Sequence, residues 1–162
     1  MIDDPNFHPL QCFLSDRLSL PAVIRELTAY LGPCALVLAL FSLSQEFITS
    51  LRVLRDDGLV TRVEVTLDHK AAEKTARLLP YLRRTVESVH MARNHAKLVL
   101  LYPADGSVPV LVATSQNGTR NARAEHYVII SGRDVCDAAC RAISAMPSFL
   151  LAGEGTDNPL PT

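Results

Sequence analysis

The pattern that most constrains the fold is the alternation of short apolar segments with segments of helical character. Residues 35–41 form an apolar run of strand length, and residues 47–54 place apolar side chains at helical spacing. A second strand is expected at 60–67, followed by a helix from His69 to about Arg84, whose end Pro80 is expected to break. The order strand, helix, strand, helix predicts an α/β fold.

The rest of the chain extends this pattern on both sides. A first helix is expected between Ser19 and Gly32. Further strands are predicted at residues 86–91, 97–102, 108–114 and 126–131, and a closing helix at 134–146. We therefore expect a mixed β-sheet flanked by helices on both faces, in a domain of residues 19–150. An irregular arm, residues 1–18, precedes this domain, and a flexible tail, residues 151–162, follows it.

The composition excludes several classes of protein. The 162 residues are 48% apolar, which suffices for one core, and the apolar run at 34–43 is too short to span a membrane. The first four residues lack the basic and apolar regions of a signal peptide, and the four cysteines form no CxxC pair, so we expect free thiols in the cytoplasm. Cys136, Cys140 and His126 match no common zinc spacing, and no metal site is predicted.

The charge is unevenly distributed along the chain, although the net charge is only -1. From residue 77 to residue 123 the sequence has two acidic residues, Glu87 and Asp105. The basic residues of the same segment are Arg77, Arg83, Arg84, Arg93, Lys97, Arg120 and Arg123. This local positive excess favours an anionic partner, and we expect nucleic acid rather than a membrane.

The strongest candidate for chemistry is the pair His95 and Lys97, at the head of the apolar run 98–101. In a β-strand both side chains would lie on one face while Ala96 points to the other. A neutral histidine can attack phosphorus and form a covalent phosphohistidine, and a lysine supplies a permanent positive charge. The pair therefore predicts a catalytic site for phosphate chemistry.

A second group of polar residues follows the next predicted strand. Asn117 can donate its amide hydrogens to a phosphoryl oxygen, and the Ser115 hydroxyl can hydrogen-bond a neighbouring group. Glu125 is placed to orient a histidine through its ring N–H. These three residues join His95 and Lys97 as catalytic candidates. The residues expected to bind substrate are Thr114, Arg120 and Arg123.

Together these two motifs resemble the signature of the phospholipase D superfamily, which is H-x-K, four residues, D, and then G-S-x-N. Thr114 stands in place of the glycine, and Tyr102 stands in place of the aspartate. Glu125 is similar to the downstream glutamate that nucleases of the restriction-enzyme branch use instead. The resemblance covers about residues 19–146 and is closest to small, single-motif members of nuclease or prophage type.

The resemblance implies a homodimer, because the family builds one active centre from two motifs related by a two-fold axis. One His95 would attack the phosphate and the other would protonate the leaving oxygen, with no metal or other cofactor. We therefore expect a metal-independent phosphodiesterase, specifically a nuclease that acts through a phosphohistidine. No other protein partner is indicated.

Two other functions stay open, and several polar residues have structural interpretations. Because Tyr102 replaces the motif aspartate, the chain could be a catalytically silent nucleic-acid-binding or regulatory protein; a phospholipid or small-phosphodiester hydrolase is the other alternative. Asp68 is expected to cap a helix, with the mouth of the site as its alternative place. Structural roles are expected for His90 and His126, and core positions for Phe41, Phe47 and Tyr127.

Overall fold

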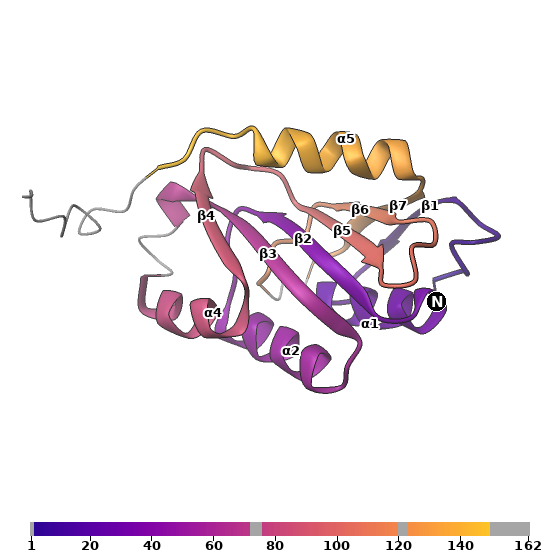
Figure 1. Ribbon diagram of the computed structural model, residues 1–162, viewed down its shortest axis with the longest axis horizontal. Helices are drawn as coiled ribbons and strands as arrows, with labels where there is room; N and C mark the ends of the chain where they lie inside the picture. The colour runs from indigo at the N-terminus through magenta and orange to yellow at the C-terminus, as the bar shows by residue number, and fades with distance from the viewer. Residues whose placement is uncertain (1, 72–75, 120–122, 150–162) are drawn as a thin grey trace, which may run out of the picture.

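A seven-stranded mixed β-sheet forms the centre of the computed structural model, which describes residues 2–71, 76–119 and 123–149 (Figure 1). The strands are β1 (Leu10–Ser15), β2 (Cys34–Leu40), β3 (Val60–Asp68), β4 (Ser88–Ala92), β5 (Leu98–Pro103), β6 (Val110–Thr114) and β7 (Glu125–Ser131). Their order across the sheet is β1-β7-β6-β5-β2-β3-β4. β2, β3 and β4 run parallel, whereas the other neighbours are antiparallel. The predicted α/β fold is confirmed.

Helices cover both faces of this sheet (Figure 1). They are α1 (Leu20–Leu31), α2 (Gln45–Asp56), the single 3-10 turn η1 (Ala76–Leu78), α4 (Leu79–Thr85) and α5 (Arg133–Ser144). α1, α2 and α4 lie together on one face, and α5 crosses the other face. None of the helices in the described part of the chain is long and apolar enough to cross a bilayer.

The alternation of side chains along β2 divides the apolar residues between the two faces. Leu36, Leu38 and Leu40 belong to the large cluster under α1, α2 and α4. Val37 and Ala39 face the smaller cluster under α5. Because helices cover both faces of the sheet at β2, the sequence of this strand is a continuous apolar run and not an alternation of apolar and polar residues.

The first two helices begin where the sequence predicts. Ser19 Oγ accepts a hydrogen bond from Ala22 N at 3.4 Å, and Ser44 Oγ accepts one from Phe47 N at 3.3 Å. Each bond satisfies one N–H group that has no partner inside its helix. Gly32 ends α1 with a φ of 73°, in the left-handed region that glycine adopts without strain.

The arm expected at residues 1–18 is wrong in part, because β1 is a strand of the central sheet. Residues 10–15 pair antiparallel with β7, from Leu10 opposite Ile130 to Ser15 opposite Glu125. Phe13 stacks on Tyr127 with 5.3 Å between ring centroids. The partner strand lies more than a hundred residues further along the chain, so no local pattern announces the pairing. The tail predicted at 151–162 lies outside the described residues.

The helix expected from His69 to about Arg84 is not continuous. Residues 69–71 are helical, and η1 and α4 follow as separate elements. Pro80 lies in the first turn of α4 rather than breaking the end of a helix. The first turn tolerates proline because the missing N–H group would have had no partner there.

Candidate functional site

The strand register brings both sequence motifs to one edge of the sheet. The last residues of β2 pair with the first of β5, as Ala39 lies opposite Leu98. Leu98 in turn lies opposite Ala113, near the end of β6. Segments that leave or enter the sheet beyond these pairs therefore lie together at this end of the strands, which we call the site edge. The term refers to the ends of the strands and not to the outer strands β1 and β4. His95, Lys97 and the turn after β6 all belong to it.

His95 and Lys97 form a contact pair at the site edge. Lys97 Nζ lies 3.4 Å from His95 Nδ1 and donates a hydrogen bond to His95 O at 3.1 Å. Ala96 packs against the cluster under α5, so the sequence prediction that it points away from the pair agrees with the structure. β5 begins one residue after Lys97, and the pair precedes the strand instead of opening it. The imidazole is exposed and faces solvent beside a cation.

Phe41 supports one side of the imidazole and is not the core residue that the sequence suggests. Its ring is half-buried, lies 5.0 Å from the His95 ring between centroids, and is tilted by 54°. β2 ends at Leu40, so the next side chain leaves the sheet at the site edge. Phe47 and Tyr127, in contrast, are core residues as expected.

Asn94 organises the backbone that carries the histidine. It is 2% exposed, its Nδ2 donates to Leu40 O at 3.2 Å and to Thr66 O at 3.3 Å, and its Oδ1 accepts from Ala96 N at 2.8 Å. One side chain thus ties the ends of β2 and β3 to the start of the segment that carries His95. No sequence motif signals this role, because it exists only where β2, β3 and the segment before β5 meet.

Asp68 also holds the segment that carries His95, through the backbone of Asn94. Its Oδ2 accepts from Asn94 N at 3.0 Å, and its Oδ1 accepts from Lys70 N at 2.9 Å and Ala71 N at 3.3 Å. Burial alone would raise the pKa of Asp68, but the three N–H groups and nearby His69 lower it below its ordinary value. The predicted helix cap is present, and the same carboxylate also reaches the site.

The turn after β6 is fixed to β7 by its side chains. Thr114 Oγ1 donates to His126 O at 2.7 Å and accepts from Gln116 N at 3.0 Å. Ser115 Oγ donates to Glu125 and accepts from His126 N at 3.1 Å. Both hydroxyl groups therefore position the turn, and Thr114 is 7% exposed.

Glu125 contacts Ser115, and β6 lies between the strand of Glu125, β7, and β5, the strand that follows His95. Two strand spacings separate β7 from β5, about 10 Å. The sequence predicts that Glu125 orients a histidine; in the structure this carboxylate accepts a hydrogen bond from Ser115 Oγ. The register of β6 and β7 decides this placement.

Gly118 brings the turn against the start of α2. Its N–H donates to Ser42 O at 2.9 Å and its carbonyl accepts from Ser44 N at 2.8 Å. A Cβ at this position would lie 2.8 Å from Leu43 Cβ and 3.1 Å from Leu43 Cα, so the contact excludes any side chain. The preceding residue, Asn117, is held with its Oδ1 buried and unpaired among the described residues.

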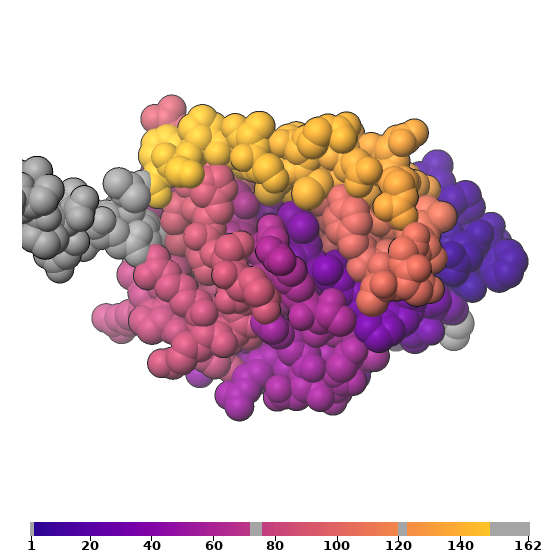
Figure 2. All heavy atoms as spheres, in the orientation of Figure 1, coloured from indigo at the N-terminus to yellow at the C-terminus, as the bar shows by residue number. Residues whose placement is uncertain are grey.

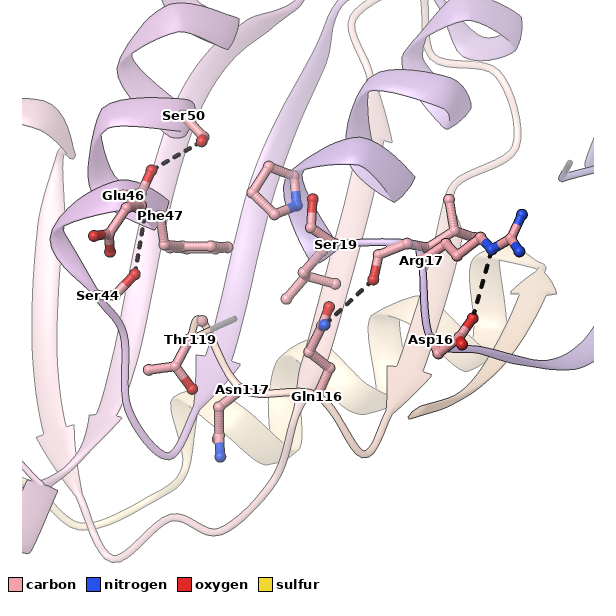
Figure 3. A pocket seen from close by; sticks show the side chains of 14 residues that line it. Asp16, Arg17, Ser19, Ser44, Glu46, Phe47, Ser50, Gln116, Asn117 and Thr119 are labelled. Atoms are coloured by element: carbon pink, nitrogen blue, oxygen red, sulfur yellow. Dashed lines mark hydrogen bonds and ion pairs between the residues drawn. The ribbon is translucent and has the colours of Figure 1, made fainter. Parts of the chain in front are cut away.

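Asn117 also lines a pocket of about 710 Å³ beside the turn (Figure 3). The N-terminal ends of α1 and α2 form two of its walls, and Asp16 and Arg17 lie at another side. Hydrogen bonds from its own backbone N–H and from Ser44 lower the pKa of Glu46, which keeps a negative charge at the start of α2. The pocket is large enough for a ligand of nucleotide size.

Tyr102 lies outside the site. Its hydroxyl donates to Asp137 Oδ1 on α5 at 3.4 Å, and its ring packs under that helix. Burial, and then the neighbouring Cys140 and Asp137, raise the pKa of Tyr102, so the phenol stays neutral. The position of the motif aspartate is therefore five residues along β5 from Lys97 and on the opposite face of the sheet.

The basic residues of the central segment do not all surround the motif. Arg93 and Arg123 are exposed at the site edge, and the Arg93 guanidinium lies 5.3 Å from the centre of the Phe149 ring. Arg83 and Arg84 lie in the last turn of α4, which leads to the start of β4. This start lies at the end of the strands opposite the site edge. Arg120 lies outside the described residues. Within the described ranges, no group of three or more metal-ligating side chains comes together.

Comparison with known proteins shows the fold. No family model and no curated protein matches the chain. The crystal structure of polyphosphate kinase from Porphyromonas gingivalis matches it with a TM-score of 0.62 at 17% sequence identity. The match covers 88% of this chain and 27% of the other, so the chain spans about a quarter of that protein. At this identity the likeness shows the fold alone, and the chain has the fold of the matched part of that polyphosphate kinase.

Proposed function

We propose that the protein is a metal-independent phosphodiesterase that cleaves nucleic acid through a phosphohistidine at His95. The observation that carries the proposal is the cation of Lys97, 3.4 Å from the His95 ring at an exposed sheet edge. A nucleophile beside a fixed positive charge suits attack on a phosphate anion. The fold supports phosphoryl-transfer or phosphodiester chemistry more generally, since the polyphosphate kinase that shares it is by name a phosphotransferase.

The proposed reaction has two displacement steps, in a centre shared by two copies of the chain. The unprotonated ring nitrogen of His95 attacks phosphorus, and the bond to the leaving oxygen breaks. That oxygen takes a proton from the imidazolium of His95 in the second copy. A water molecule then gives its proton back to that second imidazole and attacks the phosphohistidine, which releases His95 and the phosphate product.

Three further side chains support this reaction in different ways. Lys97 neutralises the phosphoryl oxygens, and the amide of Asn117 donates to them from the other motif. Ser115 is a positioning residue, because its hydroxyl is already engaged with Glu125 and His126. Glu125 acts through this serine and keeps the turn that carries Asn117 in place.

Nucleic acid is the substrate that the surroundings of His95 favour. The pocket of about 710 Å³ that Asn117 lines has room for a nucleotide, and Asn117 is the side chain proposed to donate to the phosphate. Arg17 at this pocket and the exposed Arg93 and Arg123 lie along the same site edge, where successive phosphates of a strand can contact them. Positive charges spaced along an edge suit a polyanion better than a single lipid headgroup.

A catalytically silent nucleic-acid-binding protein is the second candidate, and the position of Glu125 favours it. Among the described residues no carboxylate is hydrogen-bonded to the imidazole, and the contacts of the His95 ring that bear on its tautomer and orientation are those with Lys97 and with the ring of Phe41. Such a site binds phosphate even where turnover is absent. Salt-sensitive DNA binding without cleavage is the result that this candidate predicts.

The test is cleavage by the unmodified protein, in excess chelator, of single-stranded DNA, double-stranded DNA, RNA and a chromogenic bis-aryl phosphate. We expect turnover on the chromogenic ester and on at least one nucleic acid, because the proposed nucleophile is a side chain. A vesicle of phosphatidylcholine serves as the lipid comparison. Turnover lost in chelator and restored by a divalent ion contradicts the mechanism, and cleavage of the lipid alone contradicts the substrate class.

A further inference from the structure

The outer edge of β1 has no neighbouring strand among the described residues. The hydrogen bond from Ser131 N to Pro9 O, at 2.8 Å, shows that the odd-numbered residues of this segment direct their backbone groups toward β7. Because hydrogen-bonded pairs alternate along an antiparallel ladder, the backbone groups of Leu10, Cys12 and Leu14 point away from β7. β1 thus presents a row of free donors and acceptors.

β4 is the outer strand on the other side of the sheet, and another segment of the chain covers part of its outer side. Along β4, Phe149 N donates to Met91 O at 2.8 Å, and Ser148 Oγ lies 2.7 Å from His90 Nε2. The segment after α5 thereby covers that edge. Soluble proteins also protect edge strands with charges, prolines or bulges, and β1 has none of these between residues 10 and 15.

The side chains on one face of β1 are also left in solvent. Leu10 is 69% exposed and Leu14 is 74% exposed, and Cys12 between them is exposed as well. Phe7, just before the strand, is 80% exposed. These N-terminal residues, indigo in Figure 2, form one end of the molecule. An apolar row on a free edge is a surface for strand addition.

We propose that β1 pairs antiparallel with β1 of a second copy of this chain, about a two-fold axis at Cys12. In this register Leu10 lies opposite Leu14 of the second copy, and the two Cys12 residues lie opposite each other. The outward backbone groups then form inter-chain hydrogen bonds, and the sheets of the two copies become continuous. A two-fold contact needs a self-complementary surface, which this sequence provides.

The segments that flank β1 carry opposite charges. An antiparallel partner strand brings the segment before β1 of one copy near the segment after β1 of the other. The first segment holds the exposed His8, and the second holds Asp16, whose side chain is 68% exposed and whose ion pair with Arg17 is long, at 3.9 Å. The Asp16 carboxylate is therefore available to the His8 imidazole of the second copy.

This contact is separate from the one that would share His95 between two copies. β1 reaches the site edge only at its last residue, where Ser15 pairs with Glu125. A two-fold axis at Cys12 therefore places the site edges of the two copies at opposite ends of the joined strands. The inference stands whether or not the proposed catalysis is correct.

The first test uses Cys12 as a reporter under mild oxidation with diamide. Opposed residues of a hydrogen-bonded pair have Cα atoms about 5.5 Å apart, which suits a disulfide. Burial and then Asp105 raise the pKa of Cys34 to about 12, and burial and then Asp137 raise that of Cys136 to about 11, so neither thiol competes. We expect a disulfide-linked dimer on a non-reducing gel, absent from Cys12→Ser. A folded chain that stays monomeric on this gel overturns the proposal.

The second test uses two double variants of β1 that remove the same leucines. Leu10→Glu with Leu14→Glu sets like charges opposite each other across the axis, whereas Leu10→Glu with Leu14→Lys sets opposite charges there. Both positions are exposed, so circular dichroism should match the unmodified protein. We expect the Cys12 cross-linked fraction to fall at least about tenfold in the first variant and to recover in the second. Equal cross-linking in the two variants contradicts the register.

Discussion

Replacement of His95 by alanine is expected to lower kcat on a bis-aryl phosphate, in excess chelator, by at least about 10⁴-fold. The substitution removes the proposed nucleophile, and in a shared centre it removes the general acid as well. The fold should survive, since the imidazole is exposed and its only described ring neighbours are Phe41 and Lys97. Initial rates measured at equal protein concentration check the prediction.

The matched control is His90→Ala, which removes a histidine of β4 that is hydrogen-bonded to Ser148, in the segment after α5. Its kcat should stay within about twofold of the unmodified protein, because this side chain has no proposed part in the reaction. Comparable rates for His95→Ala and the unmodified protein would show that another group attacks the phosphate. Circular dichroism of all three proteins distinguishes lost chemistry from lost structure.

Asp68→Ala is expected to destabilise the protein by about 3 kcal/mol, the largest effect on stability among the site residues. The carboxylate is 7% exposed and accepts hydrogen bonds from three backbone N–H groups, one of them at Asn94. Without it these donors lose their acceptor, and the segment that carries His95 loses its support. Urea unfolding near neutral pH, followed by circular dichroism, measures the change.

The destabilisation should depend on pH. Burial acts to raise the pKa of Asp68, but the hydrogen bonds from Asn94, Lys70 and Ala71 lower it below the ordinary value of about 3.9. A carboxylate with a lowered folded-state pKa contributes its stability above the ordinary value and loses it as the pH falls through the folded-state pKa. The difference between Asp68→Ala and the unmodified protein should therefore shrink below about pH 4.

A suitable control is Asp56→Ala, which breaks an exposed ion pair with Arg52 of 3.7 Å. Both of its side chains are more than half exposed, so the change in unfolding free energy should stay within about 0.5 kcal/mol at any pH. An Asp68→Ala effect as small as this one would mean that the three N–H groups find other acceptors.

Local patterns were enough to predict most of the fold. The apolar run of β2 and the helical spacing of α2 follow from the residues themselves, as does the extent of α1 between Ser19 and Gly32. β1 was missed because its six residues become a strand only by pairing with β7 near the other end of the chain. The break before α4 was misplaced, because Pro80 starts that helix rather than ending one.

The motifs of the candidate site can be predicted from the sequence, but the contacts that hold those motifs in place cannot. The spacing of His95 and Lys97 predicts two side chains on one face of a strand; in the structure the pair precedes β5, and Lys97 Nζ lies 3.4 Å from His95 Nδ1. Asn94 bonds three separate strands or loops, so its role depends on the assembled sheet. The partner of Glu125 depends in the same way on the register of β6 and β7. Phe41 was assigned to the core because the turn after β2 leaves no local signal.

The most direct test of the central claim is to trap the covalent intermediate. The protein is mixed with a phosphodiester that carries a radioactive phosphate, quenched in alkali within the first turnovers, and digested for mass spectrometry. We predict a label on His95, stable in alkali, lost in acid, and absent from His95→Ala. Turnover of the same substrate with no label on the chain, or with the label on another residue, would contradict a phosphohistidine at His95.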